Sequence, residues 1–151
     1  MPTMNAWNDQ PAEPHVNEQG RFVDPSATEA ERNWGMFTHL AGALAVFDGL
    51  GIVAMIVTPV LWRTKARQSP FLDDHGRDAT NFQLSMLLYT LVGSAVVALF
   101  TLGLGLVPWL IAIAVVRLVG NIRGAMAANR GEYYRYPVCI RFFNEPVNAA
   151  A

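Results

Sequence analysis

Two long apolar runs constrain this chain more than any other feature of its sequence. They extend from Leu40 to Leu61 and from Leu84 to Val107, and the second contains no charged residue. A helix needs roughly 20 apolar residues to cross the hydrocarbon core of a bilayer. A soluble bundle can bury one such run, but two runs of this length predict an integral membrane protein.

A third apolar segment is less uniform than the first two. It starts at Trp109 and runs to about Ala128, and Arg117, Asn121 and Arg123 interrupt it. The three segments together predict an all-α fold, a polytopic integral membrane helical bundle with three transmembrane helices. Their expected bounds are about 27–62, 74–107 and 109–128.

Asp48, Gly49 and Gly51 leave an alternative for the first segment. Glycine permits a turn and aspartate often occupies one. A helix from Ala27 to Phe47 and another from Leu50 to Trp62 would then form a hairpin, which gives four helices. The single long helix is the first expectation, because the second piece of such a hairpin is short for a full span.

The 11 Lys and Arg residues set the expected orientation. Four of them follow the first segment, four follow the third or lie at its exit, and none lies between the second and third. The positive-inside rule places the loop 63–80 and the C-terminus in the cytoplasm, with Trp62 at the membrane interface. With three spans the N-terminus lies outside, whereas a broken first segment makes it cytoplasmic.

Composition limits the other possibilities. Charged residues make up 15% of the chain, against about 25% in a typical soluble domain. The net charge of −1 argues against a nucleic-acid partner. Cys139 is the one cysteine, so neither an internal disulfide nor a thiolate zinc site is expected.

The two ends of the chain are expected to be disordered. Residues 1–25 are rich in proline, asparagine and acids and lack periodicity, and residues 144–151 are short and polar or small. Ser26 followed by Glu29 matches a capping box. The membrane domain is therefore expected over 26–143.

Asp48 and Arg117 are the charges deepest in the predicted spans. At about 1.5 Å per residue both lie roughly 20 Å from the polar ends of their helices, so we expect them to pair. Asn121 shares a helix face with Arg117. Gly120 and Gly124 form a GxxxG pattern, which lets another helix approach closely, within the chain or in a dimer.

The polar stretch from Ser69 to Ser85 separates the first two apolar runs. Asp73, Asp74, His75 and Asp78 are potential metal ligands, but their spacing matches no recognised metal motif. Ser69-Pro70 is typical of a helix start. We therefore expect a polar collar, with Asn81 and Gln83 at the headgroup level, and no metal, cofactor or catalytic residue.

The segment 129–143 follows the third span. Gly131 suits a helix C-cap, and tyrosines and other apolar residues then alternate with Arg135 and Arg141, which is strand-like. Pro137 argues against a central strand. We expect an amphipathic tail that lies on the membrane or folds back onto the loop.

Three motifs, "ERNWGMFTHLAG", "SPFLDDHGRDATNFQLS" and "NRGEYYRYPVCIRFF", resemble a group of small bacterial membrane proteins of unknown function. That group is related to the small membrane subunit of the chloroplast inner-envelope protein-import translocon (the Tic20-like family). The resemblance implies a compact multi-helix domain in the bacterial cytoplasmic (inner) membrane. The residues that carry it are Asp73, His75, Gly76, Asp78, Asn81, Gln83, Gly131, Glu132, Tyr133, Tyr134, Arg135, Tyr136 and Pro137.

The leading functional hypothesis is a non-enzymatic multi-pass membrane protein, a translocon-like or membrane-assembly accessory component. Its expected partners are the lipid bilayer and either other membrane proteins or further copies of itself. The alternative is a small oligomeric channel or transporter with a polar path at Asp48, Arg117 and Asn121. A third reading is a metal-dependent membrane enzyme built on Asp73, Asp74, His75 and Asp78.

Overall fold

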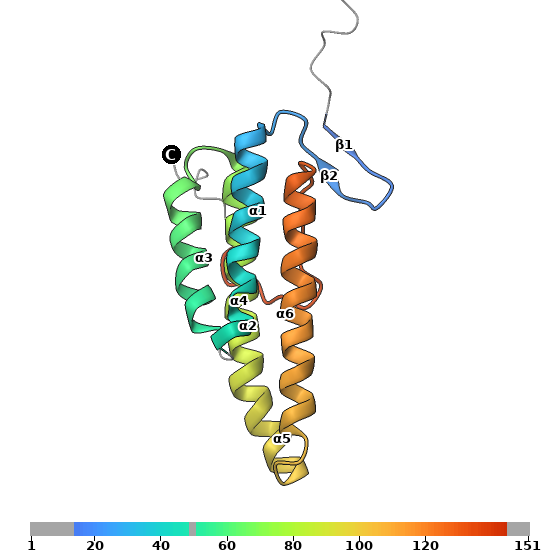
Figure 1. Ribbon diagram of the computed structural model, residues 1–151. Coiled ribbons are helices and arrows are strands. Elements are labelled where there is room, and N and C mark those ends of the chain that lie inside the picture. The colour runs from blue at the N-terminus through green and yellow to red at the C-terminus, as the bar shows by residue number, and fades with distance from the viewer. Residues whose placement is uncertain (1–13, 49–50, 145–151) are drawn as a thin grey trace, which may run out of the picture.

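The computed structural model describes residues 14–48 and 51–144, and these are helical apart from one short strand hairpin and the connecting segments (Figure 1). The all-α expectation is confirmed. The elements in chain order are β1 (His15–Val16), β2 (Phe22–Val23), α1 (Glu29–Ala43), α2 (Ala45–Asp48), α3 (Ile52–Lys65), α4 (Pro70–Leu88), the π-helical turn η1 (Tyr89–Gly93), α5 (Ser94–Thr101) and α6 (Leu106–Asn129).

The longest part of the molecule is a pair of antiparallel rods (Figure 1). Helices α4, η1 and α5 run on as one rod over Pro70–Thr101, and α6 returns beside it over Leu106–Asn129. Both are long and apolar enough to cross a membrane. At about 1.5 Å per residue the 24 residues of α6 extend roughly 36 Å, against about 30 Å for a hydrocarbon core.

The expectation of one helix over 27–62 is wrong. Helix α1 ends at Ala43, α2 adds four residues up to Asp48, and α3 begins at Ile52. Gly51 precedes α3 with a φ of +76°, a left-handed conformation that side chains disfavour. A Cβ at this position would also lie 2.1 Å from Nη1 of Arg117. The turn therefore depends on glycine, and the hairpin alternative describes the structure.

The helical hairpin of α1 and α3 is shorter than the α4–α6 pair. Figure 1 shows its turn, at α2, part-way along α6 and the rod of α4, η1 and α5, rather than beside the connection between α5 and α6. Both ends of the hairpin lie at the same end of the molecule as the C-terminal end of α6. A three-span arrangement, with the N-terminus and the tail on opposite sides, does not describe this fold.

Residues 14–28 are ordered against the tail, unlike the disorder expected over 1–25; residues 1–13 lie outside the described part. His15 pairs with Val23 and Val16 with Phe22, around a turn in which the Asn17 side chain accepts from the amide of Arg21. The predicted capping box is displaced by two residues. Thr28 caps α1 and exchanges hydrogen bonds with Glu31, in place of Ser26 and Glu29.

The expectation of a loop over 63–80 and a helix from 74 is wrong in its boundaries. Ser69 caps α4 by accepting from the amide of Phe71, and Pro70 takes the first helical position, as the Ser69-Pro70 pattern predicts. The whole run from Phe71 to Gln83 is buried. Trp62 is also buried, at 3% exposure, so its ring packs inside the protein, and its place at the membrane interface stays a prediction.

The burial of polar and apolar side chains differs between the two ends of the molecule. Polar side chains of the first half of α4 are buried, while large apolar side chains near the α5–α6 connection are exposed, Leu102 at 91% and Leu104 at 86%. No charged residue occurs from Leu84 to Val116. The apolar exterior near the α5–α6 connection suits contact with lipid, and the burial of the polar side chains at the other end keeps them away from it.

We expect Gly51→Ala to destabilise the fold more than Gly103→Ala. Both glycines have positive φ, so each substitution costs roughly 1–2 kcal/mol of backbone strain. A Cβ at Gly51 also meets Arg117, whereas nothing lies within 4 Å of one at Gly103. Thermal unfolding of the purified variants in detergent measures the difference. Equal losses would show that the contact with Arg117 does not hold the turn.

Candidate functional site at the polar end of the bundle

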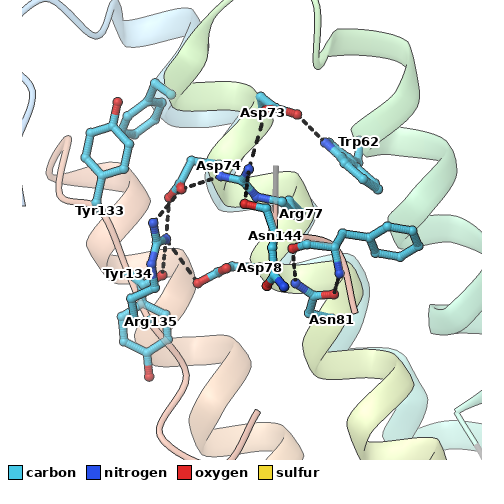
Figure 2. A network of polar contacts seen from close by, with 12 residues as sticks. Trp62, Asp73, Asp74, Arg77, Asp78, Asn81, Tyr133, Tyr134, Arg135 and Asn144 are labelled. Atoms are coloured by element: carbon cyan, nitrogen blue, oxygen red, sulfur yellow. Dashed lines mark hydrogen bonds and ion pairs between the residues drawn. The ribbon is translucent and has the colours of Figure 1, made fainter. Parts of the chain in front are cut away.

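Four polar side chains form a stripe on α4, which we call the α4 stripe. They are Asp74, Asp78, Asn81 and Ser85, at spacings of four, three and four residues, so they share one helix face. The tail that follows α6 lies along this face (Figure 2). The α4 stripe, the tail 130–143 and the strand hairpin together form what we call the polar cap.

The charged half of the α4 stripe is occupied by Arg135 of the tail (Figure 2). Its Nη1 lies 2.5 Å from Oδ2 of Asp74 and 3.1 Å from Oδ2 of Asp78, and its Nη2 lies 2.6 Å from Oδ1 of Asp74. Arg77 adds a further bond to Asp74 at 2.9 Å. This two-pronged geometry is the strong form of the arginine–carboxylate pair. The hydrogen bonds to Asp74, above all, raise the pKa of Arg135.

The uncharged half of the α4 stripe binds the backbone of the tail. Oδ1 of the Asn81 side chain accepts from the backbone N–H groups of Phe142 and Phe143, and its Nδ2 donates to the backbone carbonyl of Phe143. The hydroxyl oxygen of Ser85 accepts from the amide of Ile140 at 2.8 Å. Side chains of α4 thus take the place of a neighbouring strand.

The strand predicted from the alternation in the tail is not formed in the described residues. The tail makes a single bridge, between Glu132 and Val23, and then runs on irregularly past Pro137. The expectation that it folds back onto the Ser69–Ser85 stretch describes its path.

A second polar layer lies deeper, between α1, α4, α6 and the tail. A hydrogen bond of 2.7 Å joins Nδ1 of His39 to the Tyr136 hydroxyl, and one of 2.8 Å joins Nε2 of His39 to Nδ1 of His75. The Tyr136 hydroxyl and the Gln83 amide both donate to the Asn121 carbonyl oxygen. These side chains are at most 5% exposed, so they bind each other in place of water.

Two of the family-motif residues, Asp73 and Gly76, join α4 to α3. The Trp62 indole nitrogen donates to Oδ1 of Asp73 at 2.8 Å (Figure 2). A Cβ at Gly76 would lie 2.4 Å from the Trp62 ring, so the glycine makes room for the indole.

The GxxxG pattern is used inside the chain. A Cβ at Gly124 would lie 2.7 Å from the His39 ring, and a Cβ at Gly120 would lie 2.8 Å from the Phe82 ring. These two glycines let α6 approach α1 and α4, which is the intrachain form of the predicted close packing.

The predicted Asp48–Arg117 pair stays a prediction, because the Asp48 side chain lies outside the described part of the structure. Arg117 is 2% exposed, donates to the Thr90 hydroxyl at 3.3 Å and lies against Gly51. Asn121 donates to the Arg117 carbonyl within α6. A conducting path through Arg117 and Asn121 also stays a prediction; both side chains are packed against their neighbours here.

Glu132 anchors the strand hairpin to the end of α6. Its carboxylate accepts from Nε of Arg130 at 2.6 Å and from Nη1 of Arg21 at 2.8 Å. The backbone N–H of Tyr133 donates to the carbonyl of Phe22. Burial, and then the nearby Asp24 carboxylate, raise the pKa of the Tyr133 hydroxyl to about 12.

The sequence alone did not point to Arg21 and Asp24 as residues of this site. The turn residues Asn17 and Gly20 between short apolar pairs were the signal that could have found this hairpin.

The acidic stretch offers little to a metal ion. Within residues 14–48 and 51–144, no three His, Cys, Asp or Glu side chains are grouped so that they could hold one. Asp74 and Asp78 instead accept from arginines, and Asp73 from Trp62.

These features define a class: a small α-helical protein in which two apolar helices of membrane length carry a cap of buried, mutually paired polar side chains. Comparison with protein families gives the particular family. Residues 30–143 match the magnetosome magnetite crystal formation protein family (MamF/MmsF), so the chain belongs to that family. Neither a curated protein nor a solved structure matches the chain.

This match overturns the resemblance to the Tic20-like family, which is wrong. The motifs that suggested it, around Asp73–Gln83 and Gly131–Pro137, lie inside the matched region. The structure gives a physical reason for the error. Those residues hold α3, the tail and the strand hairpin in place, so they mark a fold and do not by themselves indicate protein import.

We expect Arg135→Leu to destabilise the protein by about 2 kcal/mol. The substitution leaves the carboxylates of Asp74 and Asp78 buried without their shared cation. The cost is below that of a fully buried pair, because the Arg135 side chain is 44% exposed. Thermal unfolding in detergent measures it. Arg135→Lys keeps the positive charge but cannot bind a carboxylate through two N–H groups at once, so we expect a loss of stability smaller than that of Arg135→Leu.

The matched control is Arg141→Leu, which removes an exposed arginine from the same tail. It should change stability by less than about 0.5 kcal/mol. Equal effects at both positions would mean that only the tail's overall positive charge matters, and that the pairing seen in Figure 2 does not.

We expect acid to release the strand hairpin. Hydrogen bonding from Arg130, and then from Arg21, holds the pKa of Glu132 below its ordinary value of 4.5. The stabilisation is therefore complete above about pH 4.5 and is lost as the pH falls through the lower folded-state pKa. Hydrogen exchange of residues 15–24, corrected for intrinsic rates, should show less protection at pH 3 than at pH 6. Glu132→Gln should abolish that difference, and unchanged wild-type protection would contradict the assignment.

Proposed function

We propose that the chain is a non-enzymatic integral membrane protein of the magnetosome that takes part in magnetite crystal formation. The observation that carries this proposal is the extent of the family match. Residues 30–143 include both membrane-length helices, the helical hairpin from the second residue of α1 onward and the whole tail, so the match covers the helical part of the fold.

The geometry favours a structural role in that process. The acids of α4 bind Arg77, Arg135 and Trp62 and are buried, so they do not offer iron an open acidic face. The outward surface of α5 and α6 is apolar and suits contact with lipid or with other membrane helices. We therefore infer that the protein acts through its contacts with lipid or with other membrane proteins.

The orientation that we propose follows from the cations. Every Lys and Arg except Arg117 lies in the polar cap or beside it, either in the connecting segments or near the cap end of a helix. The positive-inside rule then favours a cytoplasmic cap, with the apolar α5–α6 connection toward the opposite face.

The test uses the full chain with a C-terminal epitope tag, expressed in a magnetite-forming bacterium. We expect the protein to purify with magnetosomes, to resist extraction by alkaline carbonate, and to lose its tag when intact magnetosomes are treated with trypsin. Recovery in the soluble fraction, or an even spread over the cytoplasmic membrane without enrichment in magnetosomes, would overturn the proposal.

A further inference from the structure

Three arginines line one side of the polar cap around a cavity of about 430 Å³. Arg123 and Arg130 come from the last two turns of α6 and its cap, Arg21 comes from the strand hairpin, and Met126 lies between the two α6 arginines. Glu132 is the one acidic residue in the lining. The cavity therefore carries a net charge of +2.

Arg123 differs from the other two arginines in this cavity. Arg21 and Arg130 both bind Glu132, but none of the ion pairs among the described residues includes Arg123. The Arg123 side chain is exposed and forms part of the cavity lining. Arg21 and Arg130 share the single carboxylate of Glu132, and Arg123 adds a third guanidinium beside them. This excess of positive charge suits an anionic ligand.

A second cavity, of about 300 Å³, shares Arg123 with the first in its lining. It lies between α6 and the tail, and its lining is almost entirely apolar, with Val115, Val116 and Val119 on one side and Val138 on the other. The rings of Tyr134 and Tyr136 close it toward the core. Arg123 belongs to both linings, so its side chain borders the basic cavity as well as the apolar groove.

The position of Arg123 along α6 matches the edge of a bilayer. It lies 17 residues after Leu106, where α6 begins. At about 1.5 Å per residue this is roughly 26 Å, close to the thickness of a hydrocarbon core of about 30 Å. The basic cavity then lies at the headgroup level, and the apolar groove runs into the hydrocarbon beside α6.

We propose that this pair of cavities binds one anionic phospholipid. Its phosphate lies among Arg21, Arg123 and Arg130, and one acyl chain lies in the groove along Val115, Val116 and Val119. A basic pocket at the membrane end of a helix is a recognised headgroup site, and the adjoining groove selects an amphiphile over a free anion.

The test uses the purified full chain in an uncharged detergent and measures bound lipid by native mass spectrometry. Phosphatidylglycerol and phosphatidylcholine with identical acyl chains are the probes. We expect one phosphatidylglycerol to be retained per chain at concentrations where phosphatidylcholine is not. Arg123→Gln should weaken phosphatidylglycerol binding about fivefold, since each arginine near an anionic surface contributes on the order of 1 kcal/mol.

Two further variants separate the headgroup from the acyl chain. Arg67→Gln removes an exposed cation from the α3–α4 connection and should leave binding unchanged. Val119→Trp places a large ring in the groove without changing any charge, and it should weaken lipid binding at an unaltered unfolding temperature. Its starting side chain is 47% exposed, so the core is not disturbed.

Inorganic phosphate is the probe for a free anion. If phosphate stabilises the protein against heat as strongly as phosphatidylglycerol does, or if Val119→Trp binds lipid like the wild type, the groove holds no acyl chain and the proposal fails. Equal losses in Arg123→Gln and Arg67→Gln would also overturn it, because binding would then follow overall charge. None of these outcomes depends on magnetosome localisation.

Discussion

The pairing of Asp74 and Asp78 with Arg135 is the interaction on which the polar cap depends. Two carboxylates buried at the end of a membrane-length helix are costly unless a cation joins them. The cation is supplied by the tail, 57 residues or more along the chain from the acids. The tail is thereby drawn across α4, where Asn81 and Ser85 bind its backbone and Tyr136 enters the core beside His39.

This arrangement explains how polar residues come to occupy the interior of such an apolar chain. The helical hairpin α1–α3 covers one side of α4, the tail covers another, and α6 contacts α1 closely because Gly124 has no side chain. Each of the five side chains in the deeper layer makes at least one hydrogen bond to a side chain of a different element. Hydrogen bonds therefore join the elements of the polar cap to one another, while the outer surface toward the α5–α6 connection is apolar.

The sequence allowed the long apolar helices and their class to be predicted, because hydrophobic length is a local property. It also indicated the start of α4 at Ser69-Pro70, which is local as well. The break of the first segment was harder to predict, because the side chain packed against Gly51 is Arg117, which comes from α6, far along the chain. The partners of Arg135 and Glu132 could not be derived for the same reason: ion pairs between remote segments leave no periodic trace. The GxxxG pattern suggested close helix packing, but it could not name His39 and Phe82 as the rings that lie against Gly124 and Gly120.

The central claim, that the tail is fastened along α4, is tested most directly by a disulfide between them. The Ser85 hydroxyl oxygen lies 3.8 Å from the sulfur of Cys139, the one cysteine of the chain. In Ser85→Cys under mild oxidation, an intramolecular disulfide between residues 85 and 139 is the expected product, found by mass spectrometry of non-reduced tryptic peptides. Free thiols at both positions, or disulfides only between separate chains, would contradict the placement of the tail on α4.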